Sequence, residues 1–253
     1  QRSLVGSEMC IRDRDISVKA LAKINLGLDV LRRREDGYHE VRMIMQTIQM
    51  YDVLEMKRVR KPGISLSVNY SYIPNDERNL VYKAAKLLMD EFQVKGGVDI
   101  HLEKFIPVAA GMAGGSSDAA AALVGINRMF QLGLTKRQLM ERGVQIGADV
   151  PYCVMRGTAL AEGIGEKLTS LPGVPMCYVL IGKPGINVST KFVYGNLHLD
   201  EVTEHPDIDG MVEAIRNHDL YGITDRMGNV LESVTCPAYP VIDEIKAQTV
   251  SYT

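Results

Sequence analysis

Apolar and polar residues alternate along the chain from Ile16 to Leu28. The residues of one face are all apolar: Ile16, Val18, Ala20, Ala22, Ile24, Leu26 and Leu28. A period of two residues is typical of a strand with one buried face. Lys23 and Asn25 fall on the other face, so we expect both side chains to point away from the core.

Other segments show the same alternation or a short continuous apolar run. Alternation predicts strands at about 41–49, 52–59 and 98–102. An apolar run bounded by two Pro-Gly pairs predicts a buried strand at 174–181.

Helices are predicted where apolar residues recur at spacings of three and four. This spacing occurs at about 79–92, and an alanine-rich segment at about 117–130 is also typical of a helix. Thr135 and Gln138 have the spacing of a capping box, which marks the start of a third helix. We expect that helix to end near Gly147, with a proline just beyond it.

This order of elements predicts an α+β, or mixed α/β, architecture. We expect an N-terminal domain over residues 15–165 and a truncated C-terminal domain over 166–248, with a boundary near 155–175. Residues 1–14 and 249–253 look foreign to the rest, and the run VGSEMCIRDR resembles translated sequencing-adapter sequence. We therefore expect both ends to be non-native additions.

The composition is that of an ordinary globular protein. The 253 residues are 46% hydrophobic and 24% charged, with a formal net charge of -2. This charge argues against a nucleic-acid partner, which usually requires a large basic excess. No apolar run approaches the roughly 18 residues of a membrane span, and the four cysteines form no CxxC pair. We expect a cytoplasmic protein without a membrane or nucleic-acid partner.

Glycine and serine gather between a predicted strand and a predicted helix, in the stretch PVAAGMAGGSSD from Pro107 to Asp118. Glycine lets main-chain N–H groups approach a ligand, and the start of a helix adds unpaired N–H donors. Such a loop suits a phosphate group. It has neither the Walker A ending nor the GxGxxG spacing, which argues against a dinucleotide oxidoreductase. The structural alternative is a flexible turn capped by serine.

Lys23 and Asp149 are candidates for phosphoryl transfer to an alcohol. An aspartate can direct the hydroxyl proton, while a lysine nearby favours the developing alkoxide and keeps the aspartate ionised. Asp149 falls at the predicted C-terminus of a helix, where the helix dipole disfavours a carboxylate. The alternatives are a turn residue for Asp149 and a solvated strand residue for Lys23.

Together these motifs resemble the GHMP kinases, named for galactokinase, homoserine kinase, mevalonate kinase and phosphomevalonate kinase. The loop at 107–117 is similar to their ATP-phosphate loop. The stretches AKINL at 22–26, DGYH at 36–39 and GADVP at 147–151 are similar, in that order, to one branch of the superfamily. That branch phosphorylates a cytidine diphosphate-linked methylerythritol in the non-mevalonate isoprenoid pathway. The resemblance spans about residues 15–248 and implies a two-domain fold with the active site in the inter-domain cleft.

The resemblance also implies roles for residues that bind ATP and act on the alcohol. It makes Asp149 the base for the C2 hydroxyl and Lys23 its charge partner. Asn79 and Lys104 would lie near the adenosine, and Mg²⁺ would accompany the nucleotide with Ser117 as its candidate ligand. The phosphates would be bound by the loop residues, which are Pro107, Val108, Ala109, Ala110, Gly111, Met112, Ala113, Gly114, Gly115, Ser116 and Ser117.

A second set of residues is implied for the cytidyl substrate. It consists of Asn25, Tyr38, His39, Thr190 and Tyr194. Stacking of a flat base between Tyr38 and Tyr194 is physically sensible, and without the resemblance Tyr38 and His39 are equally a surface pair on a hairpin. We expect a small-molecule substrate and a monomer or homodimer.

One motif of the resembled family is missing. The family carries a further glycine-rich stretch similar to GSGPT, and nothing after Val241 resembles it. We therefore expect this chain to be weakly active or inactive. The alternatives are another GHMP kinase with a mevalonate-, homoserine- or sugar-type substrate, and an inactive nucleotide-binding fragment.

Overall fold

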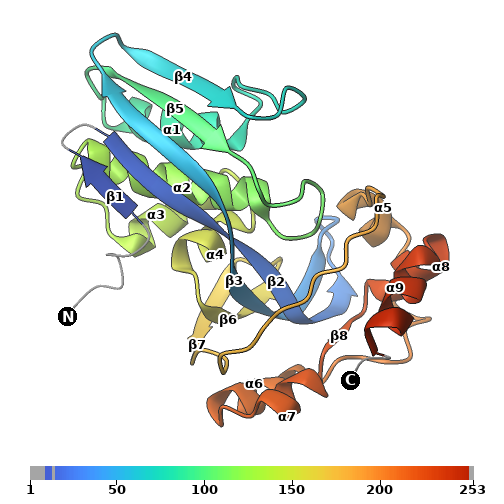
Figure 1. Cartoon of the computed structure of the whole chain (residues 1–253). Helices are drawn as coiled ribbons and strands as arrows, with labels where there is room; N and C mark the ends of the chain where they lie inside the picture. Colours follow the sequence, from blue (N-terminus) through green and yellow to red (C-terminus); the bar gives the residue numbers. More distant parts are fainter. Residues whose placement is uncertain (1–8, 13–14, 251–253) are drawn as a thin grey trace. The chain divides into compact units, whose positions relative to one another are not determined.

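The computed structural model describes residues 9–12 and 15–250, so most of the two ends expected to be non-native lies outside the described residues (Figure 1). The chain divides into two compact units. Unit 1 comprises the chain up to Lys23 together with 47–108 and 112–156. Unit 2 comprises 24–46, 109–111 and the chain from Gly157 onward.

The strands of unit 1 follow the order β1-β2-β3-β5-β4. Their bounds are β1 Met9–Arg12, β2 Asp15–Arg33, β3 His39–Val59, β4 Gly63–Val68 and β5 Gly97–Glu103. β5 pairs antiparallel with β3 and parallel with β4, so Ile100 lies opposite both Met56 and Leu66. The strands expected from the alternation at 16–28 and 98–102 are confirmed.

The two strands expected at 41–49 and 52–59 are instead one continuous strand, β3. Asp52 interrupts the apolar alternation, and a polar residue at such a point suggests a turn. In the structure Asp52 is completely buried within the strand, because its carboxylate has partners inside the unit. The interruption therefore marks a buried charge and not the end of a strand.

The helices described in unit 1 are α1 Leu80–Glu91, α2 Gly114–Met129, α3 Lys136–Gly143 and α4 Val150–Met155. The helix expected at 79–92 is confirmed, and so is the capping box between Thr135 and Gln138. α2 begins at Gly114, three residues before the expected start. α3 ends at Gly143, before the expected Gly147, because a turn and then α4 take up the residues that follow.

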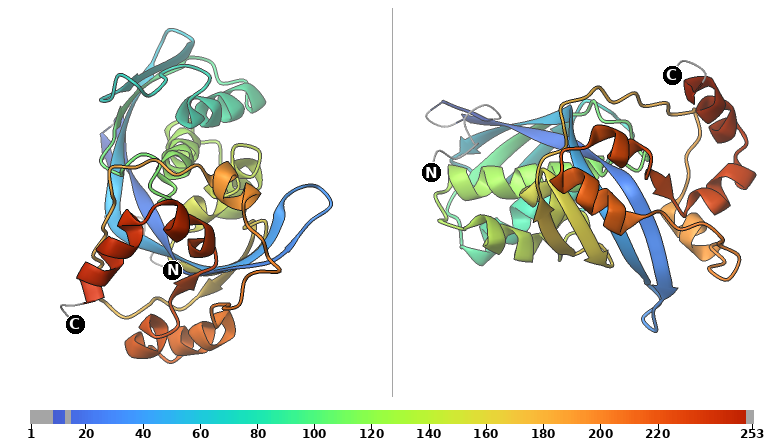
Figure 2. Two further views of the ribbon diagram at one scale, coloured as in Figure 1. Left: turned by 90° about the vertical axis from the view of Figure 1, so that its right-hand side faces the viewer. Right: turned by 90° about the horizontal axis from the view of Figure 1, so that it is seen from below.

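Helices α1 and α2 lie on one side of the strands of unit 1 (Figure 2). α1 buries the face that its apolar spacing predicts, including Val81 and Leu88. α2 buries a face of small residues, and a Cβ added at Gly125 would overlap the side chain of Met56. The lack of a side chain at Gly125 thus lets α2 approach β3 closely.

Unit 2 is built on the parts of β2 and β3 that unit 1 does not include. β3 pairs antiparallel with β6 (Thr158–Gly163), β6 pairs with β7 (Lys167–Leu171), and β2 pairs with the short β8 (Gly228–Asn229). Its helices are α5 Thr190–Gly195, α6 Ile208–Arg216, α7 Leu220–Thr224, α8 Glu232–Ala238 and α9 Val241–Val250. Met211 and Ile215 of α6 pack with Leu26 and Ile44 in its core.

The prediction of a buried strand at 174–181 is wrong. These residues have no regular secondary structure, and the side chains of Met176, Tyr178 and Leu180 are exposed. Within the described residues no strand pairs with this segment, so its main-chain groups have no ladder to join. An apolar run indicates a preference for burial, but it does not supply the neighbour that burial requires.

Helix length also bears on membrane association. Over the residues that the structure describes, no helix combines the length and the apolar character that crossing a membrane requires.

Candidate active site

The glycine-rich stretch forms the connection from β5 to α2. Ala109, Gly111 and Ala113 all have positive φ angles, of 54°, 69° and 54°. For alanine this conformation is strained, and such strain persists only where the surrounding structure fixes it. The turn brings the chain to Gly114, where α2 begins, so the first N–H groups of a 16-residue helix stand at the end of the loop. This is the arrangement that suits a phosphate group.

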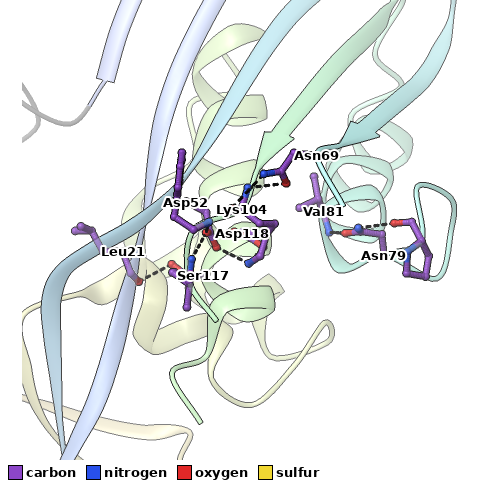
Figure 3. A network of polar contacts seen from close by, with 11 residues as sticks. Leu21, Asp52, Asn69, Asn79, Val81, Lys104, Ser117 and Asp118 are labelled. Atoms are coloured by element: carbon purple, nitrogen blue, oxygen red, sulfur yellow. Dashed lines mark hydrogen bonds and ion pairs between the residues drawn. The ribbon is translucent and has the colours of Figure 1, made fainter. Parts of the chain in front are cut away.

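Strand β2 holds this loop at two points. The N–H of Lys23 donates to the carbonyl oxygen of Met112 at 3.2 Å, and the hydroxyl of Ser117 donates to the carbonyl oxygen of Leu21 at 2.6 Å. Figure 3 shows the second of these bonds. The residue types of the sequence gave no indication of either contact, because both accepting groups are main-chain carbonyls. The backbone of Lys23 is thereby fixed against the loop.

Lys23 was expected to point away from the core, with a solvated strand residue as the alternative. Its side chain is in fact buried, with 5% of its surface exposed. An ammonium group is rarely buried without partners, so this burial argues for a specific role.

Asp149 also differs from its expected position. It stands at the start of α4, directly before Val150, and not at the C-terminus of α3. The expected unfavourable helix dipole therefore does not apply to it. Its side chain makes no capping hydrogen bond to α4 among the described residues, so the carboxylate is not committed to the helix.

Asp149 and Lys23 both adjoin the glycine-rich loop. The helix that Asp149 opens, α4, packs against α2, and a Cβ added at Gly147 would lie 3.9 Å from the Ser116 hydroxyl oxygen. The backbone of Lys23 is bonded to Met112 in the same loop. Two residues separated by more than a hundred positions in sequence are thus both placed beside the loop.

The two residues expected near the adenosine are engaged with the protein. The Asn79 side chain accepts from the Val81 N–H at 2.9 Å and donates to the Pro74 carbonyl at 2.7 Å, so it caps α1 (Figure 3). The Lys104 ammonium donates to the carboxylates of Asp52 and Asp118. Contact of either side chain with a nucleotide stays a prediction.

Sequence reasoning missed Asp52 and Asp118. Both are buried, and Lys104 between them is 5% exposed. Burial raises the pKa of Asp118 to about 8, with Lys104 opposing the rise and Asp52 adding to it. The available signal was the position of Asp118 directly after the two serines of the loop motif.

The residues implied for the cytidyl substrate belong to unit 2. The rings of His39 and Tyr194 lie with their centroids 5.1 Å apart and their planes tilted by 35°. Tyr38 is 61% exposed, and Thr190 opens α5 on the surface. Burial lowers the pKa of His39, and Arg33 lowers it further. Stacking of a base between Tyr38 and Tyr194 stays a prediction, since the ring found beside Tyr194 is that of His39.

Ser117 stays the candidate protein ligand for a magnesium ion that accompanies the nucleotide. The described part of the chain offers no group of three or more His, Cys, Asp or Glu side chains that could hold a metal ion. Mg²⁺ is commonly held by few protein groups together with substrate phosphates. The hydroxyl proton of Ser117 is used on Leu21, which leaves its oxygen lone pairs for such a contact.

Comparison with known proteins defines the class first. Residues 79–157 match the family described as GHMP kinases N terminal domain. A solved homoserine kinase from Cytophaga hutchinsonii shares the fold, with a TM-score of 0.63 over 87% of this chain and 73% of that chain at 17% identity. The expected mixed α/β GHMP kinase fold is confirmed.

Proteins with higher sequence identity then identify the branch of the GHMP kinase superfamily. The 4-diphosphocytidyl-2-C-methyl-D-erythritol kinase of Lachnospira eligens is 59% identical over 94% of this chain and 82% of its own length. A crystal structure of 4-(cytidine 5'-diphospho)-2C-methyl-D-erythritol kinase matches with a TM-score of 0.77 at 30% identity, over 93% of this chain and 82% of that one. The chain belongs to the family of 4-diphosphocytidyl-2-C-methyl-D-erythritol kinases.

Proposed function

We propose that this protein transfers the terminal phosphoryl group of ATP to the C2 hydroxyl of 4-diphosphocytidyl-2-C-methyl-D-erythritol. The reaction belongs to the non-mevalonate route to isoprenoids. The observation that carries the proposal is the placement of Lys23, whose side chain is buried and whose backbone is bonded to the glycine-rich loop, while Asp149 opens the helix α4 that packs against α2. A phosphate-binding loop, a buried cation and an aspartate are the parts that phosphoryl transfer to an alcohol requires.

The glycine-rich loop and the start of α2 bind the ATP phosphates through main-chain N–H groups. Asp149 accepts the proton of the attacking hydroxyl, or directs it, as the new oxygen–phosphorus bond forms. Lys23 stabilises the developing alkoxide and keeps Asp149 ionised. Mg²⁺ that arrives with the nucleotide supplies charge neutralisation at the phosphates, with the oxygen of Ser117 as its candidate protein ligand.

In unit 2, Asn25, Tyr38, His39, Thr190 and Tyr194 bind the cytidyl half of the substrate. The lowered pKa of His39 keeps its ring neutral near pH 7. A neutral imidazole has one donor and one acceptor nitrogen, which matches the mixed edge of a cytosine. The aromatic ring of Tyr194 offers a face on which the flat base can stack.

The test is a turnover assay with ATP and a panel of alcohols. We expect at least weak phosphorylation of 4-diphosphocytidyl-2-C-methyl-D-erythritol, with phosphorus NMR locating the new phosphate on the C2 oxygen. Mevalonate, homoserine and sugars should not be phosphorylated under the same conditions. ATP binding without turnover of the cytidyl substrate would contradict the proposal. It would favour the alternative hypothesis, in which the chain is an inactive nucleotide-binding fragment.

A further inference from the structure

Three ionisable side chains are buried together next to the residues that flank the glycine-rich loop. Asp52 comes from β3, Lys104 follows β5, and Asp118 belongs to the first turns of α2. The Lys104 ammonium lies between the two carboxylates and donates to Asp52 Oδ2 and, at 2.7 Å, to Asp118 Oδ2 (Figure 3). We call these three residues the buried triad. Their exposed fractions are 0%, 5% and 3%, so solvent has almost no access to them.

The buried triad connects the two ends of the loop. Asp52 Oδ1 accepts from the N–H groups of Phe105 at 2.5 Å and Ile106 at 2.7 Å, the two residues immediately before the loop begins at Pro107. Asp118 immediately follows Ser117, where the loop motif ends. One ammonium group therefore links the residues that enter the loop to the helix that leaves it.

The main chain of Lys104 is also held in place. The Lys104 N–H donates to the side-chain oxygen of Asn69 at 3.0 Å, and the Asn69 amide donates back to the Lys104 carbonyl at 3.2 Å. A Cβ added at Gly114 would lie 3.1 Å from the Lys104 ammonium nitrogen and 3.2 Å from an Ile106 methyl carbon. The ammonium thus packs directly against the first residue of α2, where a side chain larger than that of glycine would be crowded.

Burying the triad costs more free energy than filling the same space with apolar side chains. The triad places two carboxyl groups against one ammonium, and Asp118 Oδ1 is a buried oxygen without a hydrogen-bond partner among the described residues. A buried, unsatisfied carboxyl oxygen opposes folding, and an apolar cluster of similar volume often gives a more stable protein. Stability alone does not account for such an arrangement, whereas a need for fixed geometry at the loop does.

We propose that Asp52, Lys104 and Asp118 are positioning residues that fix the separation between the two ends of the glycine-rich loop and so set the geometry of its phosphate-binding N–H groups. They act on ATP through the loop and do not touch it with their side chains. This inference rests on the proposed function only in taking the loop as the ATP-phosphate site. It changes the role of the Lys104 side chain from nucleotide contact to support of the loop.

Direct binding of ATP tests the inference, since binding is measurable whether or not the cytidyl substrate is turned over. We expect Asp118→Leu, which removes the acceptor for Lys104, to weaken ATP binding by roughly 10- to 100-fold, because small misplacements of binding groups have effects of this size. Asp118→Asn keeps an oxygen in the same place and should retain most of the affinity. Lys104→Met, which removes the link itself, should weaken binding at least as much as Asp118→Leu.

The matched control lies on the same helix. Asn127, near the other end of α2, bonds to the main chain of Leu134 in both directions, at 2.9 and 3.0 Å. Asn127→Ala should lower the melting temperature without changing ATP affinity, which separates general destabilisation from loss of positioning. The proposal is overturned if Asp118→Leu binds ATP as tightly as Asp118→Asn. It is also overturned if Asn127→Ala weakens ATP binding as much as Asp118→Leu at an equal loss of melting temperature.

Should Lys104→Met fail to fold, the comparison of Asp118→Leu with Asp118→Asn still decides the question. If the wild-type protein binds ATP but leaves the cytidyl substrate unchanged, the proposed substrate is wrong while the positioning role remains supported by the binding data. The two proposals therefore fail in distinguishable ways.

Discussion

The two units fix their site residues to very different degrees. In unit 1, Lys23, the start of α2 and the residues before the loop are held by buried hydrogen bonds and ion pairs. In unit 2, Tyr38 and Thr190 are exposed, and the rings of His39 and Tyr194 form a tilted pair. Phosphate chemistry needs donors fixed in advance, whereas stacking on a flat base tolerates adjustment. The contrast is consistent with catalysis in unit 1 and recognition in unit 2.

The largest expected effect is that of Asp149→Asn. Removing a general base typically lowers the rate by about 10²- to 10⁴-fold, and the amide keeps the shape of the side chain. We expect kcat to fall by that amount while ATP affinity is unchanged, as measured by steady-state kinetics and by direct binding. Turnover at the wild-type rate would remove Asp149 from the catalytic role and weaken the assignment of catalysis to unit 1.

Core packing in unit 1 gives the next effect. Ile100 of β5 is completely buried between neighbouring strands, so Ile100→Ala removes contacts and leaves a cavity. We expect the free energy of unfolding to fall by about 2–5 kcal/mol, as measured by urea denaturation. A loss of less than about 0.5 kcal/mol, the usual size for surface positions, would show that unit 1 is less well packed than its contacts indicate.

A pH dependence should appear in recognition by unit 2. Burial, assisted by Arg33, lowers the pKa of His39 below the ordinary histidine value, so its ring is neutral at pH 7 and gains a proton only at lower pH. Protonation removes the acceptor nitrogen, so KM for the cytidyl substrate should rise as the pH falls through this lowered pKa and stay constant above pH 7. His39→Gln should lack this acidic rise. An unchanged pH profile in that variant would contradict the assignment.

The smallest effect is expected at residues 174–181, the segment for which the sequence predicts a buried strand. The Leu180 side chain is 83% exposed, so Leu180→Ala removes few contacts. We expect a change in unfolding free energy within about 0.5 kcal/mol, measured beside Ile100→Ala under the same conditions. A loss as large as that of Ile100→Ala would mean that Leu180 is buried in solution.

The spacing of apolar residues predicted the strands and helices that bury one face and expose the other. The alternation at β2 and β5 and the apolar spacing of α1 each reflect a buried face and an exposed face, which a sequence records directly. The segment at 174–181 shows the limit of this reasoning, since an apolar run contains no information about its neighbour. β3 shows a second limit, because Asp52 resembles a break until Lys104 is known to lie against it.

The candidate site was predicted through motifs more than through physical patterns. Spacing and residue type indicated the loop and the candidates Lys23 and Asp149, and the resemblance then assigned a role to each of the two residues. The burial of Lys23 and the bonds from β2 to the loop could not be predicted, because they involve main-chain atoms and residues far apart in sequence. The buried triad could not be predicted for the same reason, since its three residues lie on separate elements and follow no regular spacing in the sequence.

The division of roles between the units is tested most directly by the full steady-state kinetics of Tyr194→Ala. Loss of a base-stacking ring typically costs about 1–3 kcal/mol, which corresponds to roughly 5- to 150-fold in affinity. The account predicts that KM for 4-diphosphocytidyl-2-C-methyl-D-erythritol rises by that factor while kcat and KM for ATP stay unchanged. A large fall in kcat with an unchanged KM for the cytidyl substrate would contradict it.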